Sequence, residues 1–327
     1  MSTEDSPGLA SDPADAKPIL ALIAGPTASG KSDLGVEFAR CLERTGRKAA
    51  IVNADSAQAY RDLRVLSARP TEEEMGGIEH FLFGDWDGAT PCSAADWASA
   101  AKTQIARLHK AGAIPVLVGG TGLYLRTLLD GIAPIPEIDP DIRQEVRSLE
   151  TETAFAALGS EDPERAAQLA PADSQRIARA LEVVRSTGQP LSYWQARLEG
   201  GIGTEVNLKA AILLPERDEL YRRCDARFEK MLQCGAMEEV EALLARNLDP
   251  DLPVVRAIGV PEIRDYLRGV IPMDELIARG SQATRNYAKR QYTWFRRQPP
   301  SDWLRLEYED FSREALKERL LHRWRLT

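Results

Sequence analysis

Residues 25–32 carry the strongest chemical signal in the chain, with the sequence Gly-Pro-Thr-Ala-Ser-Gly-Lys-Ser. This is the G-x-x-x-x-G-K-[ST] pattern, in which backbone N–H groups and a lysine surround the oxygens of a phosphate chain. The apolar stretch Ile19–Ala24 before it predicts a buried strand, and residues 32–44 after it predict a helix. Strand, loop and helix in this order favour a phosphate-binding loop over an accidental glycine-rich loop. The chain is therefore expected to bind a nucleotide or another diphosphate.

Each residue of this loop is a candidate ligand of the diphosphate. The lysine would reach the outer phosphates, and the hydroxyl of the last serine would hold Mg²⁺. Magnesium is thus the metal that the pattern predicts, with Ser32 as its protein ligand. The expected diphosphate-binding residues are Gly25, Pro26, Thr27, Ala28, Ser29, Gly30, Lys31 and Ser32.

Asp55 is the candidate general base. It follows the second predicted strand, 49–52, within the run Asn-Ala-Asp-Ser. A carboxylate at the end of a parallel strand can bind Mg²⁺ through water or accept a proton from a substrate. An aspartate that only forms a turn or caps a helix has the same sequence context, so both interpretations remain open.

The third predicted strand, 114–118, ends in Gly119-Gly120-Thr121-Gly122. An ordinary ATPase carries an acid at this point to hold its metal ion, and this chain has none. The two glycines suggest backbone packed against a ligand, with the Thr121 hydroxyl directed at a phosphate.

A basic segment lies near the end of the chain. Residues 281–300 contain five arginine and lysine residues and no acid, and on a helical wheel these bases span about 140°. An ordinary solvated face and a surface for a polyanion are both compatible with this pattern. Arg217, Arg223 and Arg227 form another basic cluster, which either meets a phosphate or pairs with acids on its own helix.

The elements that must position these residues alternate along the chain. Predicted strands at 19–24, 49–52, 114–118 and 210–214 are followed by helical patterns at 32–44, 93–110 and 218–246, except that 134–200 is almost wholly helical. Alternation predicts an α/β fold with a mostly parallel sheet, in which ligands bind at the carboxyl ends of the strands. We expect a flexible tail at 1–17, a P-loop core at 18–133 and 201–327, and an all-helical insertion at 134–200. Additional core helices are the alternative for the insertion.

Composition narrows the class of protein. The 327 residues are 43% hydrophobic and have a net charge of −8, which weakly disfavours a nucleic-acid partner although a local basic face can still bind one. No apolar run reaches the length of a membrane span, so no membrane association is expected. Four scattered cysteines and three histidines predict neither disulfides nor a structural zinc site, and they fit a reducing cytoplasm.

These motifs in this order resemble the tRNA dimethylallyltransferases, also called tRNA isopentenyltransferases, over about residues 19–300. Five segments carry the similarity: the phosphate loop, Asn53 to Tyr60, Gly119 to Tyr124, Arg256-Ala257-Ile258-Gly259, and Thr284 to Phe295. The resemblance implies transfer of a dimethylallyl group from dimethylallyl diphosphate to N6 of the adenine at tRNA position 37. The phosphate loop would then hold the diphosphate of the prenyl donor and not ATP, which accounts for the missing acid after the third strand.

The resemblance also implies a role for particular residues. Asp55 would accept the N6 proton, while Lys31, Thr121 and Ser32 with Mg²⁺ would stabilise the departing diphosphate. Arg227 would face the same diphosphate, with Arg217 as the second choice. The adenine must leave its stack, and the helical insertion would clamp the anticodon stem-loop. The expected tRNA-binding residues are Asp55, Ser56, Ala57, Gln58, Arg143, Gln175, Arg176, Ile177, Ala178, Arg179, Arg256, Arg285, Lys289 and Arg290. A cytoplasmic monomer of the bacterial type is expected.

The chain departs from the family pattern in a few places. Residues 64–70, Arg-Val-Leu-Ser-Ala-Arg-Pro, stand where Asp-Ile-Gly-Thr-Ala-Lys-Pro is usual, so that Leu66 replaces a glycine and Arg69 a lysine. Phe81 replaces a histidine and Val260 an aromatic residue. Three other functions remain as rivals: an adenylate isopentenyltransferase acting on free AMP, ADP or ATP, a P-loop small-molecule kinase, and an RNA-binding protein switched by a nucleotide.

Overall fold

The computed structural model describes residues 17–307 and 313–326, so the expected tail at 1–17 lies outside it except for Lys17. Its strands are β1 (Ile19–Ala24), β2 (Ala49–Asn53), β3 (Glu79–Phe81), β4 (Ile114–Gly119), β5 (Gly131–Ile132), β6 (Glu199–Gly200), β7 (Asn207–Leu214) and β8 (Leu304–Glu307). Its longer helices are α1 (Lys31–Arg44), α3 (Ala94–Lys110), α4 (Gly122–Asp130), α5 (Pro140–Ser148), α6 (Thr151–Glu161), α8 (Ser174–Thr187), α10 (Arg217–Gln233), α11 (Ala236–Ala245), α12 (Val260–Leu267), α13 (Met273–Arg297) and α14 (Arg313–Trp324). Three short helices complete the set: α2 (Glu72–Met75), α7 (Pro163–Ala166) and α9 (Leu191–Gln195).

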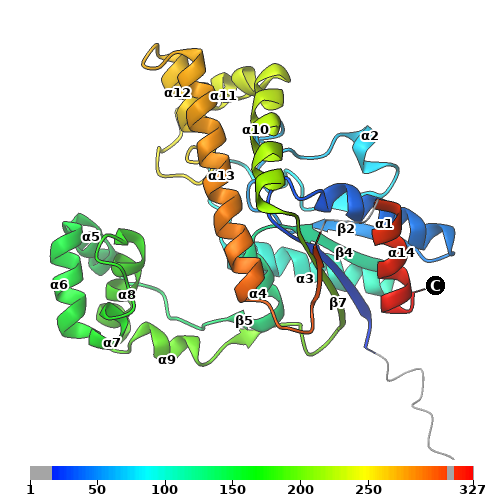
Figure 1. The fold of residues 1–327 in the computed structure, drawn as a ribbon. Helices are drawn as coiled ribbons and strands as arrows, with labels where there is room; N and C mark the ends of the chain where they lie inside the picture. Colours follow the sequence, from blue (N-terminus) through cyan, green and yellow to red (C-terminus); the bar gives the residue numbers. More distant parts are fainter. Residues whose placement is uncertain (1–16, 308–312, 327) are drawn as a thin grey trace, which may run out of the picture. The chain divides into compact units, whose positions relative to one another are not determined.

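A parallel sheet of six strands, in the order β3-β2-β4-β1-β7-β8, forms the centre of the fold (Figure 1). Ala24 at the end of β1 pairs in register with Gly119 of β4 and with Ile212 of β7. Asn53 at the end of β2 pairs with Val118. The loops that follow β1, β2 and β4 therefore leave the sheet at the same edge, as the alternation of strands and helices predicted.

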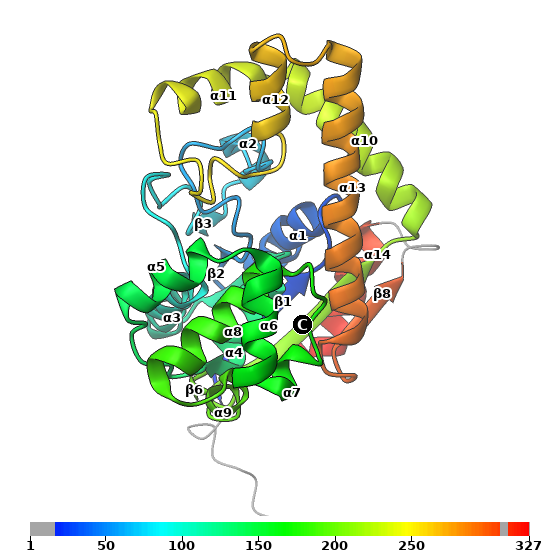
Figure 2. The ribbon, with the colours of Figure 1, turned by 90° about the vertical axis from the view of Figure 1, so that its left-hand side faces the viewer.

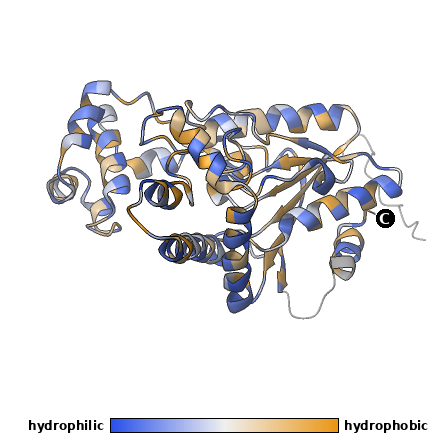
Figure 3. Ribbon diagram, turned by 90° about the horizontal axis from the view of Figure 1, so that it is seen from above, coloured by the Kyte–Doolittle hydropathy of each residue, from blue (hydrophilic) through white to orange (hydrophobic). Residues whose placement is uncertain are grey.

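The central strands of the sheet are buried, and they are also coloured as apolar along their length (Figure 3). Helices α1 and α14 pack on one face, where Phe38 and Leu42 join Ile23, Val116 and Leu320 in one core. Strands buried on both faces read as continuous apolar runs, which is why β1, β2, β4 and β7 could be recognised in the sequence. Strands β3 and β8 at the two edges are short and partly exposed, and the pattern missed them.

Helices α10 and α13 lie side by side beyond the sheet in both views (Figures 1 and 2). The single helix expected over 218–246 is two helices, α10 and α11, that are separated at Cys234 and Gly235. Gly235 adopts a left-handed conformation with φ of 101°, which a continuous helix does not allow.

Residues 127–202 form a second compact unit, and residues 1–126 with 203–327 form the first. In the second unit, helices α5, α6 and α8 enclose their own core, in which Leu158, Ile177 and Leu181 are fully buried. The chain enters and leaves this unit through one antiparallel pair, β5 with β6. The unit begins at Thr127, earlier than the insertion expected at 134–200.

No helix in the described part of the chain is both long enough and apolar enough to span a membrane.

Candidate active site

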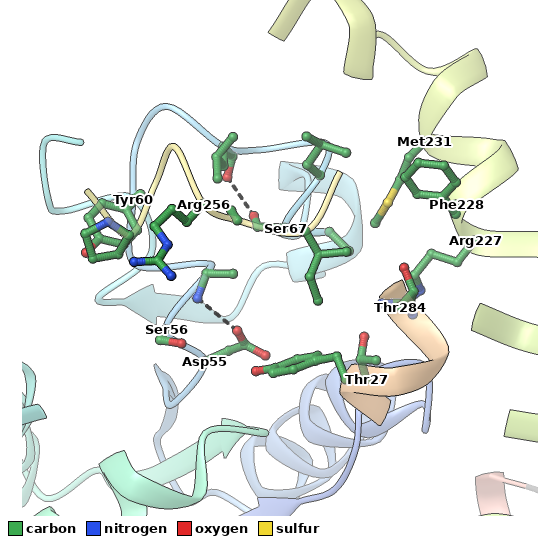
Figure 4. Close-up of a pocket in the computed structure, with 18 of the residues that line it drawn as sticks. Thr27, Asp55, Ser56, Tyr60, Ser67, Arg227, Phe228, Met231, Arg256 and Thr284 are labelled. Atoms are coloured by element: carbon green, nitrogen blue, oxygen red, sulfur yellow. Dashed lines mark hydrogen bonds between the residues drawn. The ribbon is translucent and has the colours of Figure 1, made fainter. Parts of the chain in front are cut away.

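A pocket of about 340 Å³ opens at the carboxyl edge of the sheet, wholly within the first unit. Its polar side carries Thr27 from the phosphate loop and Asp55 and Ser56 from the segment after β2, and Arg227 faces them from α10 (Figure 4). Thr284, Tyr287 and Arg290 of α13 complete the polar lining. The structure thus joins the phosphate loop and the candidate base in one cavity.

The phosphate loop has the tight path that its sequence predicts. Gly30 has a φ of 84° and Ala28 a φ of 61°. Lys31 is buried, and its Nζ donates to the carbonyl oxygen of Pro26 at 3.2 Å. Burial lowers the pKa of Lys31 to about 8; the nearby carboxylate of Asp55 opposes this shift and the guanidinium of Arg227 adds to it. The three charged groups expected to carry the chemistry are therefore close enough to interact electrostatically.

Asp55 both forms a turn and lines the pocket. One oxygen of its carboxylate accepts the N–H of Ala57 at 3.1 Å, and its own N–H donates to Asn53 Oδ1 at 2.8 Å. The Asn53 amide in turn donates to the carbonyl of Asp55 at 2.9 Å. The two interpretations of Asp55 are thus compatible, because the turn fixes the carboxylate at the pocket wall.

The Thr121 hydroxyl hydrogen-bonds to Ser56, the residue that follows Asp55. It accepts the Ser56 N–H at 2.9 Å and donates to Ser56 Oγ at 3.2 Å. Thr121 and Ser56 also lie close enough to the Tyr287 hydroxyl to affect its pKa, which burial raises. Thr121 does not line the pocket, unlike the expectation that its hydroxyl points at a phosphate. It supports Ser56 instead.

The glycines after β4 pack against protein and not against an open ligand site. A Cβ on Gly119 would lie 2.1 Å from the backbone of Ala54. A Cβ on Gly122 would lie 2.5 Å from the ring of Trp294. The expectation of backbone pressed against a ligand is therefore corrected: these glycines let the ends of β2 and β4 and helix α13 approach one another.

One wall of the pocket is apolar. Phe228 and Met231 of α10 lie beside Arg227 (Figure 4), and Leu66 and Ile258 belong to the same lining. Phe228 is held tightly, since a Cβ on Gly280 of α13 would lie 2.0 Å from its ring. The cavity thus offers an apolar surface next to its charged groups.

A carboxylate from α11 shapes this wall. Glu239 accepts the backbone N–H groups of Arg64, Val65 and Leu66, the last two at 2.8 and 2.9 Å. Gln58, an expected tRNA contact, is buried, and its amide donates to the carbonyls of Ser67 and Ala68 at 3.1 and 2.9 Å. Both side chains hold the loop 64–68, in which the sequence departs from the family pattern.

The two other arginines of the α10 cluster do not line the pocket. Arg223 Nε donates to Glu219 on its own helix at 2.6 Å, as one of the open interpretations had it. Arg217 begins α10 and lies over the ring of Tyr292, 5.1 Å from its centroid. Of the three, Arg227 is thus the one in position to meet a ligand in this cavity.

The basic face of α13 is less uniform than its sequence suggested. Arg285 pairs with Asp225 of α10 at 2.6 Å, so an acid distant in sequence compensates this charge. Lys289 and Arg290 are exposed, and Arg290 also lines the pocket and lies 5.7 Å from the centroid of the Tyr287 ring. Residues 281–300 contain no acid, but the charge of Arg285 is nevertheless compensated, by an acid on another helix.

The expected tRNA contacts of the second unit differ in exposure. Arg143, Gln175 and Arg176 are exposed, and Arg176 pairs with Asp173 at 3.0 Å. Arg179 and Ala178 are half-buried, and Arg179 lies 3.7 Å from Glu182. Ile177 is fully buried in the core of the unit, and its place among the expected tRNA-binding residues stays a prediction. Outside this unit, Ser56, Ala57 and Arg256 line the pocket.

Several pocket residues had no role assigned from the sequence. Thr284 and Tyr287 of α13 line the pocket, and Gln291 on the same side of the helix hydrogen-bonds to the phosphate loop without belonging to the lining. The spacing of three and four residues between them marks one side of a helix. This spacing is visible in the sequence, but the residues expected to bind on this helix were its arginines and lysines.

The donor set for a metal is small. Ser32 is partly exposed at the start of α1, and the described residues contain no group of three histidine, cysteine or carboxylate side chains that could hold an ion. Mg²⁺ commonly keeps several waters and takes its other oxygens from phosphates, so a single hydroxyl beside a diphosphate fits this ion. A site made of protein ligands alone does not fit.

Comparisons with known proteins identify the family. A family model described as IPP transferase matches residues 58–298. A tRNA dimethylallyltransferase of Erythrobacter litoralis is 63% identical over 300 residues, covering 92% of this chain and 95% of the relative. One from Novosphingobium aromaticivorans is 67% identical over 265 residues, covering 81% and 94%. The crystal structure of a tRNA isopentenylpyrophosphate transferase from Bacillus halodurans has a TM-score of 0.67 and 32% identity, covering 95% of this chain and 97% of that one. On its sequence and its fold, the chain belongs to the IPP transferase family.

Proposed function

We propose that this protein transfers a dimethylallyl group from dimethylallyl diphosphate to N6 of the adenine at tRNA position 37, releasing diphosphate. One observation carries the proposal: a single pocket joins a phosphate loop, a carboxylate and an apolar wall. A nucleotide kinase needs no apolar wall for its transferred group. The apolar side of this cavity matches a short hydrocarbon, and the carboxylate opposite matches an amine that must lose a proton.

The diphosphate belongs at the phosphate loop. The backbone N–H groups of the loop and the ammonium of Lys31 offset its charge, and Arg227 approaches from α10. Ser32 would hold Mg²⁺, whose charge would further neutralise the diphosphate. These charges lie where the leaving group gains electrons, so they stabilise the transition state more than the bound donor.

The acceptor adenine belongs on the side of Asp55. Its amine is a weak nucleophile because the nitrogen lone pair is shared with the ring. In the transfer, the C1–O bond of the donor breaks as the bond from N6 to C1 forms, and an N6 proton passes to the Asp55 carboxylate. The electron pair of the broken bond leaves with the diphosphate. The hydrogen bond from Ala57 fixes the carboxylate and leaves oxygen lone pairs free for this proton.

The acceptor is a tRNA anticodon stem-loop in this proposal. Exposed arginines in the second unit and the exposed Lys289 and Arg290 of α13 provide positive charge for its phosphates. A base in a loop can be turned out of its stack at modest cost, and the pocket then reads its edge and face. We further propose that the protein acts as a cytoplasmic monomer.

Mass spectrometry of the acceptor tests this function. An unmodified anticodon stem-loop is incubated with the protein, Mg²⁺ and dimethylallyl diphosphate in the presence of free AMP and ATP, and its adenine 37 should gain one C₅H₈ unit. Prenylated free AMP with unmodified RNA would indicate the adenylate isopentenyltransferase instead. Consumption of ATP without a prenylated product would indicate a kinase, and both results would reject the proposal.

A further inference from the structure

A single buried amide joins two loops of the pocket edge. Gln291 of α13 is 6% exposed. Its Oε1 accepts the backbone N–H of Thr27 in the phosphate loop at 2.7 Å. Its Nε2 donates to the carbonyl oxygen of Gly120, after β4, at 2.8 Å. One side chain therefore bridges the loop after β1 and the loop after β4.

The local structure makes room for this amide and requires its chemistry. A Cβ on Gly120 would lie 2.4 Å from Nε2, so a larger residue there would displace the side chain. The bridge needs one acceptor and one donor at the end of one long side chain, and the glutamine amide supplies both. A glutamate keeps the acceptor and loses the donor, and a methionine of similar length has neither strong group. The direct backbone link between the loops, from Gly25 N–H to Gly119, is long at 3.4 Å.

The two bridged loops hold opposite halves of the proposed reaction. The loop after β1 receives the diphosphate of the donor. On the other side, Thr121 follows Gly120 and accepts the N–H of Ser56 at 2.9 Å, and Ser56 is next to the base Asp55. The bridge thus connects the donor site to the segment that holds the acceptor site.

We propose that Gln291 is a positioning residue that sets the distance between the reacting carbon of the prenyl donor and the amine of the adenine. This inference rests on the proposed function. Gln291 accepts the N–H of Thr27, so this contact is made within the protein and Gln291 is not itself a ligand of diphosphate. Its loss should therefore slow the transfer step and leave the binding of diphosphate intact.

Two variants test the bridge from different sides. Gln291→Glu keeps the acceptor for Thr27 and sets an oxygen against the Gly120 carbonyl, whereas Gln291→Met removes both hydrogen bonds. Gln298, exposed at the end of the same helix, supplies matched controls as Gln298→Glu and Gln298→Met. For each protein, the thermal midpoint, the affinities for inorganic diphosphate and for tRNA, and the single-turnover rate at saturating donor and tRNA are measured.

We expect the single-turnover rate to fall while the affinities for diphosphate and tRNA stay nearly constant. Misplacement of reacting groups by about 1 Å costs on the order of 100-fold in rate, so both Gln291 variants should fall by about 10- to 100-fold. Their affinities for inorganic diphosphate and for tRNA should stay within about threefold, and the Gln298 variants should match the wild type.

Three results would overturn the proposal. A folded Gln291 variant with nearly the wild-type single-turnover rate would show that the bridge does not position the substrates. A loss of diphosphate affinity that accounts for the whole change in rate would make Gln291 a binding residue. Failure of both variants to fold would assign the amide to stability alone. If the wild type itself forms no prenylated tRNA, the proposed function fails, which is a separate outcome.

Discussion

At the scale of single residues, Asp55 links local structure to chemistry. The residue is 8% exposed and its carboxylate is anchored by the N–H of Ala57, so its position does not depend on a bound substrate. An asparagine at the same place can still accept this N–H through its Oδ1. The substitution therefore separates the role of Asp55 in the turn from its role as a base.

Asp55→Asn should preserve the pocket and remove the proton acceptor. Loss of a general base costs about 100- to 10,000-fold in rate, and we expect kcat to fall within this range. The affinity for tRNA should change little, because the amide occupies the same space. Timed assays of prenylated RNA measure kcat, and a tRNA binding curve measures the affinity. A variant with near-normal kcat would exclude Asp55 as the base.

The charge of Lys31 should make diphosphate binding depend on pH. Its pKa is lowered to about 8, mainly by burial, so the ammonium is present below this pH and is lost above it. Affinity for inorganic diphosphate should therefore decline as the pH rises through 8, by up to about tenfold per pH unit for one proton. Calorimetry across this range measures the decline.

The ligand also titrates, so Lys31→Met provides the reference. Both proteins meet the same ionic form of inorganic diphosphate at each pH. The ratio of their affinities isolates the contribution of Lys31. A ratio that stays constant from pH 7 to 9 would contradict the assignment of the lowered pKa to this group.

At the scale of elements, most of the sheet and the phosphate loop were predictable from local pattern. Buried parallel strands have continuous apolar runs, and the loop after β1 has a fixed spacing of glycine, lysine and serine. The partner of Arg285 and the bridge of Gln291 were not predictable, since Asp225 and Thr27 lie 60 and 264 residues away from them. The buried position of Ile177, in contrast, follows from its spacing with Ala180, Leu181 and Val184 along one apolar side of α8.

The hydrogen bonds between Glu239 of α11 and the loop 64–66 can be tested by substitution. Glu239→Gln removes the charge that accepts three backbone N–H groups. Hydrogen bonds to a charged group contribute about 1.5–3 kcal/mol, so we expect a loss of about 2 kcal/mol in the free energy of unfolding. Because Leu66 lines the pocket, the KM for the prenyl donor should rise as well.

Urea denaturation and steady-state kinetics measure these two effects. Glu238→Gln, a change at the exposed neighbouring residue, is the matched control. Equal stability of the two variants would mean that the carboxylate of Glu239 contributes no more than a surface charge.

Helix α13 should bind tRNA through its uncompensated bases. Removing one phosphate contact lowers the slope of log affinity against log salt by about 0.7–0.9. We expect this decrease for Lys289→Gln, because Lys289 is exposed. The decrease for Arg285→Gln should be smaller, since Asp225 already balances that charge. Filter binding at several salt concentrations compares the two variants, and an equal decrease would show that the ion pair opens when tRNA binds.

At the scale of the whole molecule, the chain enters and leaves the second unit through two adjacent strands, β5 and β6. Gly131 pairs with Gly200 and Ile132 with Glu199, so the strands that enter and leave the second unit are adjacent. Every residue that lines the pocket belongs to the first unit. One internal deletion between β5 and β6 can therefore remove much of the proposed tRNA surface and leave the donor site in place.

Replacing residues 133–198 with Asn-Gly should close β5 and β6 into a two-residue hairpin. The shortened protein should bind inorganic diphosphate within about threefold of the wild type, because the same loop donors and charges remain. Its affinity for tRNA should fall by at least about tenfold, because the exposed arginines of the second unit are lost. Calorimetry and filter binding test the two expectations. Retained tRNA affinity would place recognition on the first unit alone.

The hydrogen bond between Thr27 and Gln291 also orders events during synthesis of the chain. Its two partners are 264 residues apart, so it cannot form until nearly the whole protein has been translated. At about 5–20 residues per second, the phosphate loop would wait between roughly 13 and 53 seconds for its partner. A nascent chain still attached to the ribosome, surrounded by tRNA, therefore lacks a finished catalytic centre until its last helices emerge.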